Sequence, residues 1–163
     1  MITGPSLSRL SVRRSYPAPR DLVFRALTEA DWLERWFCPS PDITVKVTQL
    51  DLRVGGRYRL AFRFPGDRTA VVVGQYRTLA RPRRLAFTWT WEPPDPHAGV
   101  ETLVTIDLYE KEGGTELALT HARFPTAQLM RQHETGWEAT LDRLKELIAK
   151  ASDETRASIQ DPM

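Results

Sequence analysis

Residues 133–148, His-Glu-Thr-Gly-Trp-Glu-Ala-Thr-Leu-Asp-Arg-Leu-Lys-Glu-Leu-Ile, have the pattern of one long amphipathic helix. One stripe of this helix is formed by side chains that lie three or four residues apart. The members of the stripe are His133, Trp137, Leu141, Leu144 and Ile148. Nearly all of the chain before residue 125 has the pattern of strands, so we predict that a sheet closes against this helix.

The strand pattern is clearest between residues 43 and 122, where apolar residues recur with a period of two. Short turns that contain glycine or proline separate the strands, which predicts an antiparallel meander with one covered and one wet face. Before this region we expect a strand at residues 7–16, a helix at 19–28 and a second short helix that begins at Asp31. The predicted fold class is therefore α+β.

The chain of 163 residues is expected to form a single domain over residues 1–150, followed by a disordered tail at 151–163. Its formal net charge of +2 is too small for a general polyelectrolyte binder. Cys38 is the only cysteine, so neither an internal disulfide nor a cysteine-based metal cluster can form. The N-terminus lacks a signal-peptide pattern, and no apolar run approaches ~20 residues. We therefore expect a cytoplasmic protein without a membrane partner.

Four ordered segments of the sequence resemble a known family. They are Pro19 and Val23–Thr28 with Trp36-Phe37, then Asp51–Tyr58, then Gly74–Tyr76 with Pro82–Trp89, and finally Thr115–His121 with His133–Trp137 and Leu141–Leu144. Together these segments resemble the SRPBCC, or START-like, superfamily. Within it they are most similar to the branch named after the C-terminal domain of the heat-shock-protein-90 ATPase activator. The resemblance covers roughly residues 8–150.

This resemblance implies a helix-grip fold, in which a curved antiparallel sheet of six or seven strands wraps around a long C-terminal helix. Two short helices follow the first strand, and a deep pocket lies between the sheet and the long helix. The superfamily has no common reaction, because its members bind lipids, sterols, polyketides or hormones, and some catalyse cyclisation. The activator itself carries a further N-terminal domain that this sequence lacks, so we do not expect a chaperone partner.

Aromatic side chains on the inward faces of the predicted elements are the main functional clue. They indicate an apolar pocket with a few polar groups, although the same residues could form an ordinary core. The candidate ligand-binding residues are Trp36, Phe62, Phe64, Gln75, Phe87, Trp89, Trp91, His121, His133, Trp137 and Leu141.

Two histidines, His121 and His133, fall on inward faces. They could orient a ligand, act as an acid–base pair near neutral pH, or be buried and hydrogen-bonded without further function. Trp137 stands where a zinc protease would have its second histidine after His133-Glu134, so we expect no metal site. Motifs for a nucleophilic serine, a phosphate loop or a dinucleotide are also missing, so we expect no cofactor.

Three further features have two interpretations each. Gly136 in a helix costs about 1 kcal/mol relative to alanine, and it allows either close packing on the sheet or room for a bound molecule. Cys38 is either a reactive thiol or a passive, partly buried residue. A basic stripe without interleaved aromatic residues follows the outer sheet face at Arg57, Arg59 and Arg63, with Arg81, Arg83 and Arg84 at a turn. We interpret these arginines as a solvated face that pairs with Asp107 on a neighbouring strand, not as a nucleic-acid site.

The sequence thus predicts binding of an apolar small molecule (lipid, polyketide or aromatic metabolite) by a carrier, sequestering or sensing protein. One alternative is an enzyme of the cyclase or hydratase type, with His121 or His133 as the general acid–base. The other alternative is a chaperone-interacting module. A non-enzymatic role is favoured, and a homodimer is left open.

Overall fold

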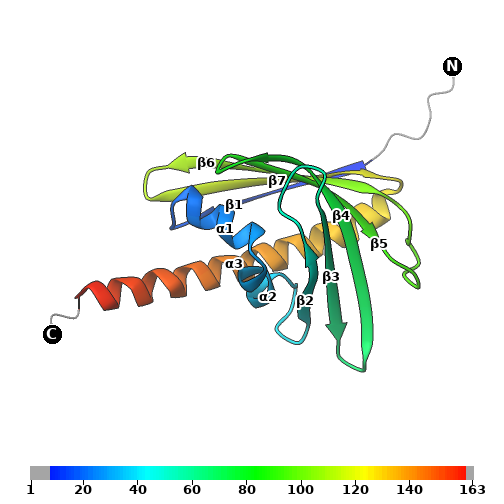
Figure 1. The fold of residues 1–163 in the computed structure, drawn as a ribbon, viewed down its shortest axis with the longest axis horizontal. Helices are drawn as coiled ribbons and strands as arrows, with labels where there is room; N and C mark the ends of the chain where they lie inside the picture. Colours follow the sequence, from blue (N-terminus) through cyan, green and yellow to red (C-terminus); the bar gives the residue numbers. More distant parts are fainter. Residues whose placement is uncertain (1–7, 161–163) are drawn as a thin grey trace, which may run out of the picture.

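A seven-stranded antiparallel sheet is the largest unit of the fold (Figure 1). This computed structural model describes residues 8–160, with side chains as far as Ala151. The strand order is β1-β7-β6-β5-β4-β3-β2, so the first strand lies beside the last one and the others form a meander. The strands are β1 (Ser8–Tyr16), β2 (Thr44–Leu50), β3 (Arg57–Phe64), β4 (Arg68–Ala80), β5 (Arg84–Trp91), β6 (Thr102–Lys111) and β7 (Gly114–Phe124).

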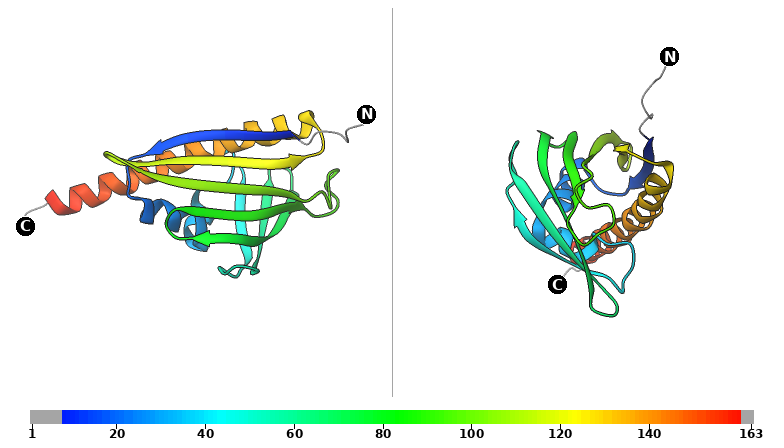
Figure 2. Two further views of the ribbon diagram at one scale, coloured as in Figure 1. Left: turned by 90° about the horizontal axis from the view of Figure 1, so that it is seen from above. Right: turned by 90° about the vertical axis from the view of Figure 1, so that its right-hand side faces the viewer.

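In the described part of the chain, three helices lie on one side of this sheet. The helices are α1 (Arg20–Thr28), α2 (Ala30–Trp36) and α3 (Ala127–Gln160). Figure 2 shows the sheet curving around α3, with α1 and α2 on the same concave side. The predicted α+β helix-grip architecture, with two short helices after the first strand, is confirmed.

The apolar stripe of α3 forms the centre of the core. Trp137 is 4% exposed, and Leu141, Leu144 and Ile148 are fully buried, as the three- and four-residue spacing predicts. The hydroxyl of Tyr16 in β1 donates a hydrogen bond to the carbonyl oxygen of Leu141 at 3.0 Å. This buried bond fixes the position of α3 along the first strand.

α3 is longer than the sequence analysis predicts. It continues to Gln160, so residues 151–160, expected to be a disordered tail, are helical in the structure. The reason is local, because this segment contains helix formers and the first helix-breaking residue is Pro162. Residues 161–163 lie outside the described part of the chain, as do residues 1–7 of the predicted domain. No helix among the described residues is both long and apolar enough to span a membrane.

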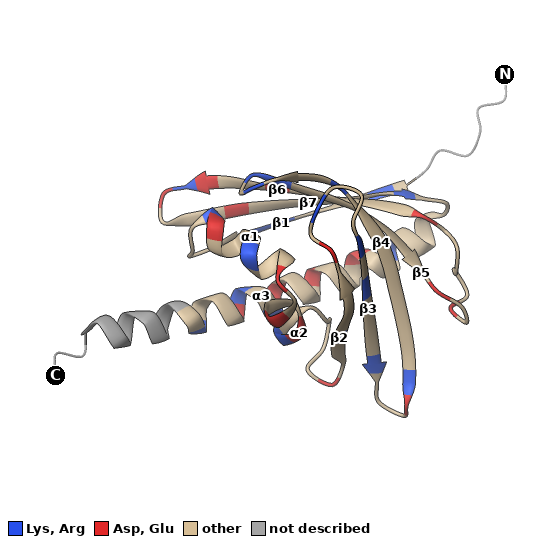
Figure 3. Ribbon diagram, viewed as in Figure 1, with Lys and Arg blue, Asp and Glu red and all other residues tan. Residues whose placement is uncertain are grey.

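The strands of the sheet contain charged residues of both signs (Figure 3). Arg59 pairs with Glu92 at 3.2 Å, and Asp107 pairs with Arg84 at 2.6 Å. The expected pairing of these arginines with Asp107 is therefore made by Arg84 and not by the Arg57–Arg63 stripe. The register places Asp107 opposite Arg84 on the neighbouring β5, two strands away from β3.

Candidate functional site

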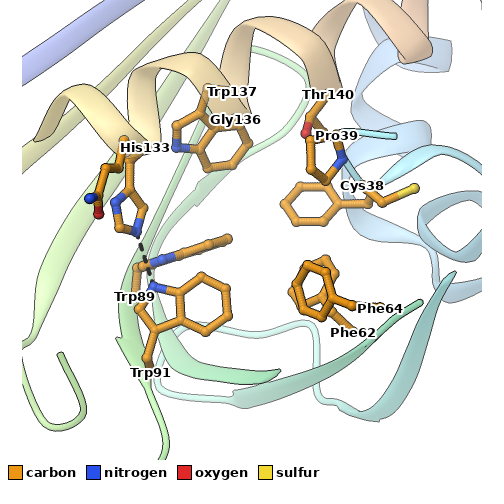
Figure 4. Close-up of a pocket in the computed structure, with 12 residues that line it drawn as sticks. Cys38, Pro39, Phe62, Phe64, Trp89, Trp91, His133, Gly136, Trp137 and Thr140 are labelled. Atoms are coloured by element: carbon orange, nitrogen blue, oxygen red, sulfur yellow. Dashed lines mark hydrogen bonds between the residues drawn. The ribbon is translucent and has the colours of Figure 1, made fainter. Parts of the chain in front are cut away.

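A cavity of about 230 Å³ lies between α3 and the sheet (Figure 4). Its wall is almost entirely apolar. It is lined by Phe37, Cys38, Pro39, Phe62, Phe64, Trp89, Trp91, Gln132, His133, Gly136, Trp137 and Thr140.

Most of the cavity wall comes from β3, β5 and α3, and the periodicity of each element explains which of its side chains face the cavity. Phe62 and Phe64 lie two residues apart in β3, as do Trp89 and Trp91 in β5, so each pair faces the same side of the sheet. The α3 residues follow the helical spacing from His133 onward. The fourth part of the wall is the segment after α2, which starts with Phe37 and continues to Pro39.

Aromatic rings pack against one another around this cavity. The ring of Phe37 lies 5.5 Å from that of Trp137 in an edge-to-face arrangement, and 6.2 Å from that of Phe62. The rings of Trp89 and Trp91 are perpendicular at 5.6 Å. Edge-to-face and tilted contacts of this kind are favourable arrangements of aromatic pairs.

The structure assembles part of the predicted ligand-binding set. The cavity wall contains Phe62, Phe64, Trp89, Trp91, His133 and Trp137 from that set. Trp36, Phe87, His121 and Leu141 are buried in the core and do not line this cavity. Phe87 instead borders a space of about 20 Å³ on the other side of Phe37 and Trp89.

The prediction for Gln75 is wrong. Tyr76 faces the core, so the alternation of β4 turns the preceding side chain to the opposite face of the sheet. Gln75 Nε2 there donates a hydrogen bond to the Gly55 carbonyl oxygen at 3.0 Å. Gln75 is therefore part of the outer face.

Several lining residues were absent from the predicted set. They are Phe37, Cys38, Pro39, Gln132, Gly136 and Thr140. A signal for the last two exists in the sequence, because Gly136 and Thr140 flank Trp137 on one face of the helix. A Cβ added at Gly136 would have no atom within 4 Å. The glycine therefore leaves open space at this position, and close packing of the helix on the sheet does not require it. The Cys38 Sγ donates to the Ser40 carbonyl oxygen at 3.4 Å.

His121 is fully buried, and both of its ring nitrogens have partners. Trp137 Nε1 donates to His121 Nδ1 at 2.9 Å. His121 Nε2 lies 2.6 Å from the Thr102 hydroxyl, which itself donates to the Trp89 carbonyl oxygen. Because an indole nitrogen can only donate, these partners assign the proton to Nε2 of a neutral ring. Burial is the larger cause that lowers the pKa of His121 well below its ordinary value, and the nearby His133 lowers this pKa further.

His133 has the opposite tautomer. Trp91 Nε1 donates to His133 Nε2 at 3.0 Å, so Nδ1 carries the proton and donates to the Leu129 carbonyl oxygen at 3.0 Å. Burial lowers the pKa of His133, while the hydrogen bond to Leu129 opposes this shift. Each histidine thus accepts from a tryptophan, and neither has a nitrogen lone pair free for a substrate.

No group of three or more His, Cys, Asp or Glu side chains suited to a metal ion occurs among the residues whose side chains are described.

Comparison with known proteins gives a consistent family assignment. The family model described as "Activator of Hsp90 ATPase homolog 1-like protein" matches residues 17–149. A solved structure of a Chromobacterium violaceum protein is 26% identical, covers 86% of this chain and 96% of its own, and has a TM-score of 0.78. A Rhodobacter sphaeroides protein is 28% identical, with coverages of 90% and 97% and a TM-score of 0.75.

The AHSA1 protein of Silicibacter pomeroyi shares the fold at 23% identity, with coverages of 88% and 99% and a TM-score of 0.78. No curated protein matches the sequence. The family resemblance predicted from the sequence is confirmed by the matching family model.

Proposed function

This chain belongs to the family of Activator of Hsp90 ATPase homolog 1-like proteins, and from that premise we propose that it binds an apolar small molecule between α3 and the sheet. The bound molecule is a lipid, polyketide or aromatic metabolite, and the protein serves as its carrier, sequestering agent or sensor.

The observation that carries this proposal is the open space beside Gly136. A glycine inside a helix costs about 1 kcal/mol relative to alanine, and close packing is not the reason here, because a Cβ would have nothing within 4 Å. An apolar cavity of about 150 Å³ can stay dry and bind benzene. The cavity in this protein is larger, at about 230 Å³, and an apolar ligand would remove its aromatic wall from water.

The hydrogen bonds of the histidines favour binding over acid–base catalysis. A general base needs a free lone pair within reach of its substrate. The lone pairs of His121 and His133 are both occupied by indole N–H groups, so catalysis would first require one of these bonds to break.

A test of the proposal is to fill the cavity from the helix side. In Gly136→Leu the new side chain would extend into the cavity, whereas Gly136→Ala adds one methyl group and serves as the matched control. We expect the apolar dye N-phenyl-1-naphthylamine to gain fluorescence with the wild type and Gly136→Ala, but not with Gly136→Leu. Equal dye binding by a folded Gly136→Leu variant would overturn the proposal, because the dye would then bind elsewhere.

A further inference from the structure

We propose that the ligand is a flat aromatic molecule of about two fused rings with one hydroxyl or carbonyl oxygen, and that Thr140 binds this oxygen. The inference rests on the proposed function and deepens it, because it specifies the size, shape and polarity of the bound molecule. The carrying observation is a buried hydroxyl without a partner in an otherwise apolar wall.

The Thr140 side chain is 5% exposed and lines the cavity. Threonine in a helix commonly donates to the carbonyl oxygen four residues earlier, as Thr135 does to Arg131 at 3.2 Å. The Thr140 hydroxyl has no hydrogen-bond partner among the described residues. The hydroxyl oxygen is not fully enclosed by protein atoms, and Thr140 is one of the residues that line the cavity.

Among the other polar groups of the wall, Trp89 Nε1 also lacks a hydrogen-bond partner, but this atom is fully enclosed by protein atoms. The remaining polar side chains are engaged or lie at the edge of the cavity. Both nitrogens of His133 have partners, and the thiol of Cys38 donates to Ser40. Gln132 is exposed to solvent at the rim. A molecule inside the cavity can therefore satisfy one buried hydroxyl, and an unsatisfied buried polar group costs about 1–3 kcal/mol.

The wall on either side of this hydroxyl consists of aromatic rings. Figure 4 shows Phe62 and Phe64 on one side of the open space and Trp89 and Trp91 on another, with Trp137 above. Ring faces and edges pack best on another π system, in offset or edge-to-face geometry. This wall suits a planar aromatic ligand better than a flexible acyl chain.

The dimensions of the cavity set the size of the ligand. His133 and Thr140 are seven residues apart on α3, which corresponds to about 10 Å along the helix axis. The volume of about 230 Å³ is roughly one and a half times that of a cavity that holds benzene. Two fused rings fit these limits, whereas a sterol or a two-chain lipid does not.

The experiment compares naphthalene with 2-naphthol, which differ by one hydroxyl group, and adds 1-tetralone as a carbonyl ligand. Binding to the wild type, Thr140→Val and Thr140→Ser is measured by isothermal titration calorimetry. Valine has nearly the shape of threonine without the hydroxyl, and serine keeps the hydroxyl. Thermal melting in parallel establishes that each variant is folded.

We expect the wild type and Thr140→Ser to bind 2-naphthol and 1-tetralone about five- to tenfold more tightly than naphthalene, as one hydrogen bond allows. In Thr140→Val this preference should disappear. A preference that survives in Thr140→Val would overturn the inference.

Two other outcomes separate this inference from the proposed function. If the two-ring ligands do not bind but palmitic acid does, and Gly136→Leu abolishes that binding, the function stands and the inference falls. If no apolar ligand binds to the wild type, both fall together.

Discussion

Gly136 is the residue at which stability and binding are expected to conflict. A Cβ there would contact nothing within 4 Å, so the change to alanine introduces no clash. We predict that Gly136→Ala raises the free energy of unfolding by about 1 kcal/mol through the higher helix propensity of alanine. Urea unfolding followed by circular dichroism measures this change. A lower stability would mean that the helix is more tightly packed at this position than the structure shows.

His121 makes the stability of the protein depend on pH. Burial and the neighbouring His133 keep its pKa well below 6.5 in the folded state, so the unfolded chain binds a proton that the folded protein rejects. The contribution of His121 to the free energy of unfolding is therefore fully present above about pH 6.5. As the pH decreases below this value, the free energy of unfolding decreases by about 1.4 kcal/mol per pH unit because of this residue. The lowered pKa of His133 acts in the same direction.

We predict that urea unfolding at pH 7.5 and 5.5 detects this loss in the wild type. His121→Gln removes the titrating ring while its amide can still accept from Trp137 and donate to Thr102. The decrease on acidification should be smaller in this variant. An unchanged decrease would show that other groups cause it.

The outcomes for single residues show where sequence reasoning succeeds. The inward position of His121 and His133 follows from alternation and helical spacing, and the structure confirms it. Their tautomers could not be predicted, because they depend on indole groups 16 and 42 residues away in the chain. Gln75 was misplaced because it was chosen for its chemistry, although the period of β4 already assigned it to the outer face.

At the scale of elements, Gly74 in β4 contrasts with Gly136 in α3, because Gly74 is tightly packed and Gly136 borders open space. A Cβ at Gly74 would lie 1.9 Å from the Thr88 carbonyl oxygen of β5 and 2.5 Å from the ring of Tyr58. Tyr58 also donates a hydrogen bond from its hydroxyl to that same carbonyl oxygen. The glycine thus allows β3, β4 and β5 to pack closely beneath a buried tyrosine.

We predict that Gly74→Ala lowers the free energy of unfolding by about 1–3 kcal/mol or more, because backbone atoms of β5 must move. Gly136→Ala is its matched comparison, since the same chemical change should there have the opposite sign. Urea unfolding of both variants gives the two values. If both substitutions shift stability in the same direction, the contrast between a packed and an open glycine is wrong.

Elements were predicted well where one periodicity extends over many residues. The meander from β2 to β7 and the buried stripe of α3 follow from repeats of two and of about 3.6. The end of α3 was predicted poorly, because the segment after residue 150 lacks an apolar stripe and only propensity favours a helix there. Helix ends without a glycine or proline signal are difficult to locate from sequence.

At the scale of the whole molecule, the cavity arises from the packing of segments far apart in the chain. The segment after α2, the strands β3 and β5, and the middle of α3 each supply part of the wall. The sequence predicted a pocket through its family resemblance. It could not define the wall, because Phe37 and Thr140 join it only through tertiary packing.

A bound ligand should stabilise the whole fold. If it binds the folded state alone, it adds about 2.7 kcal/mol when its free concentration is one hundred times its dissociation constant. We predict that 2-naphthol raises the melting temperature of the wild type and Gly136→Ala in a concentration-dependent way. Gly136→Leu should show no such increase. A rise of the same size in all three proteins would indicate binding outside the cavity.

The central claim is that the space between α3 and the sheet holds a small apolar molecule. Its most direct test is native mass spectrometry of the protein purified from its own source. We predict a stoichiometric adduct that is lost on denaturation, and whose mass identifies the ligand. The bare mass of the polypeptide, without any shift after incubation with an apolar extract of the same cells, would contradict the claim.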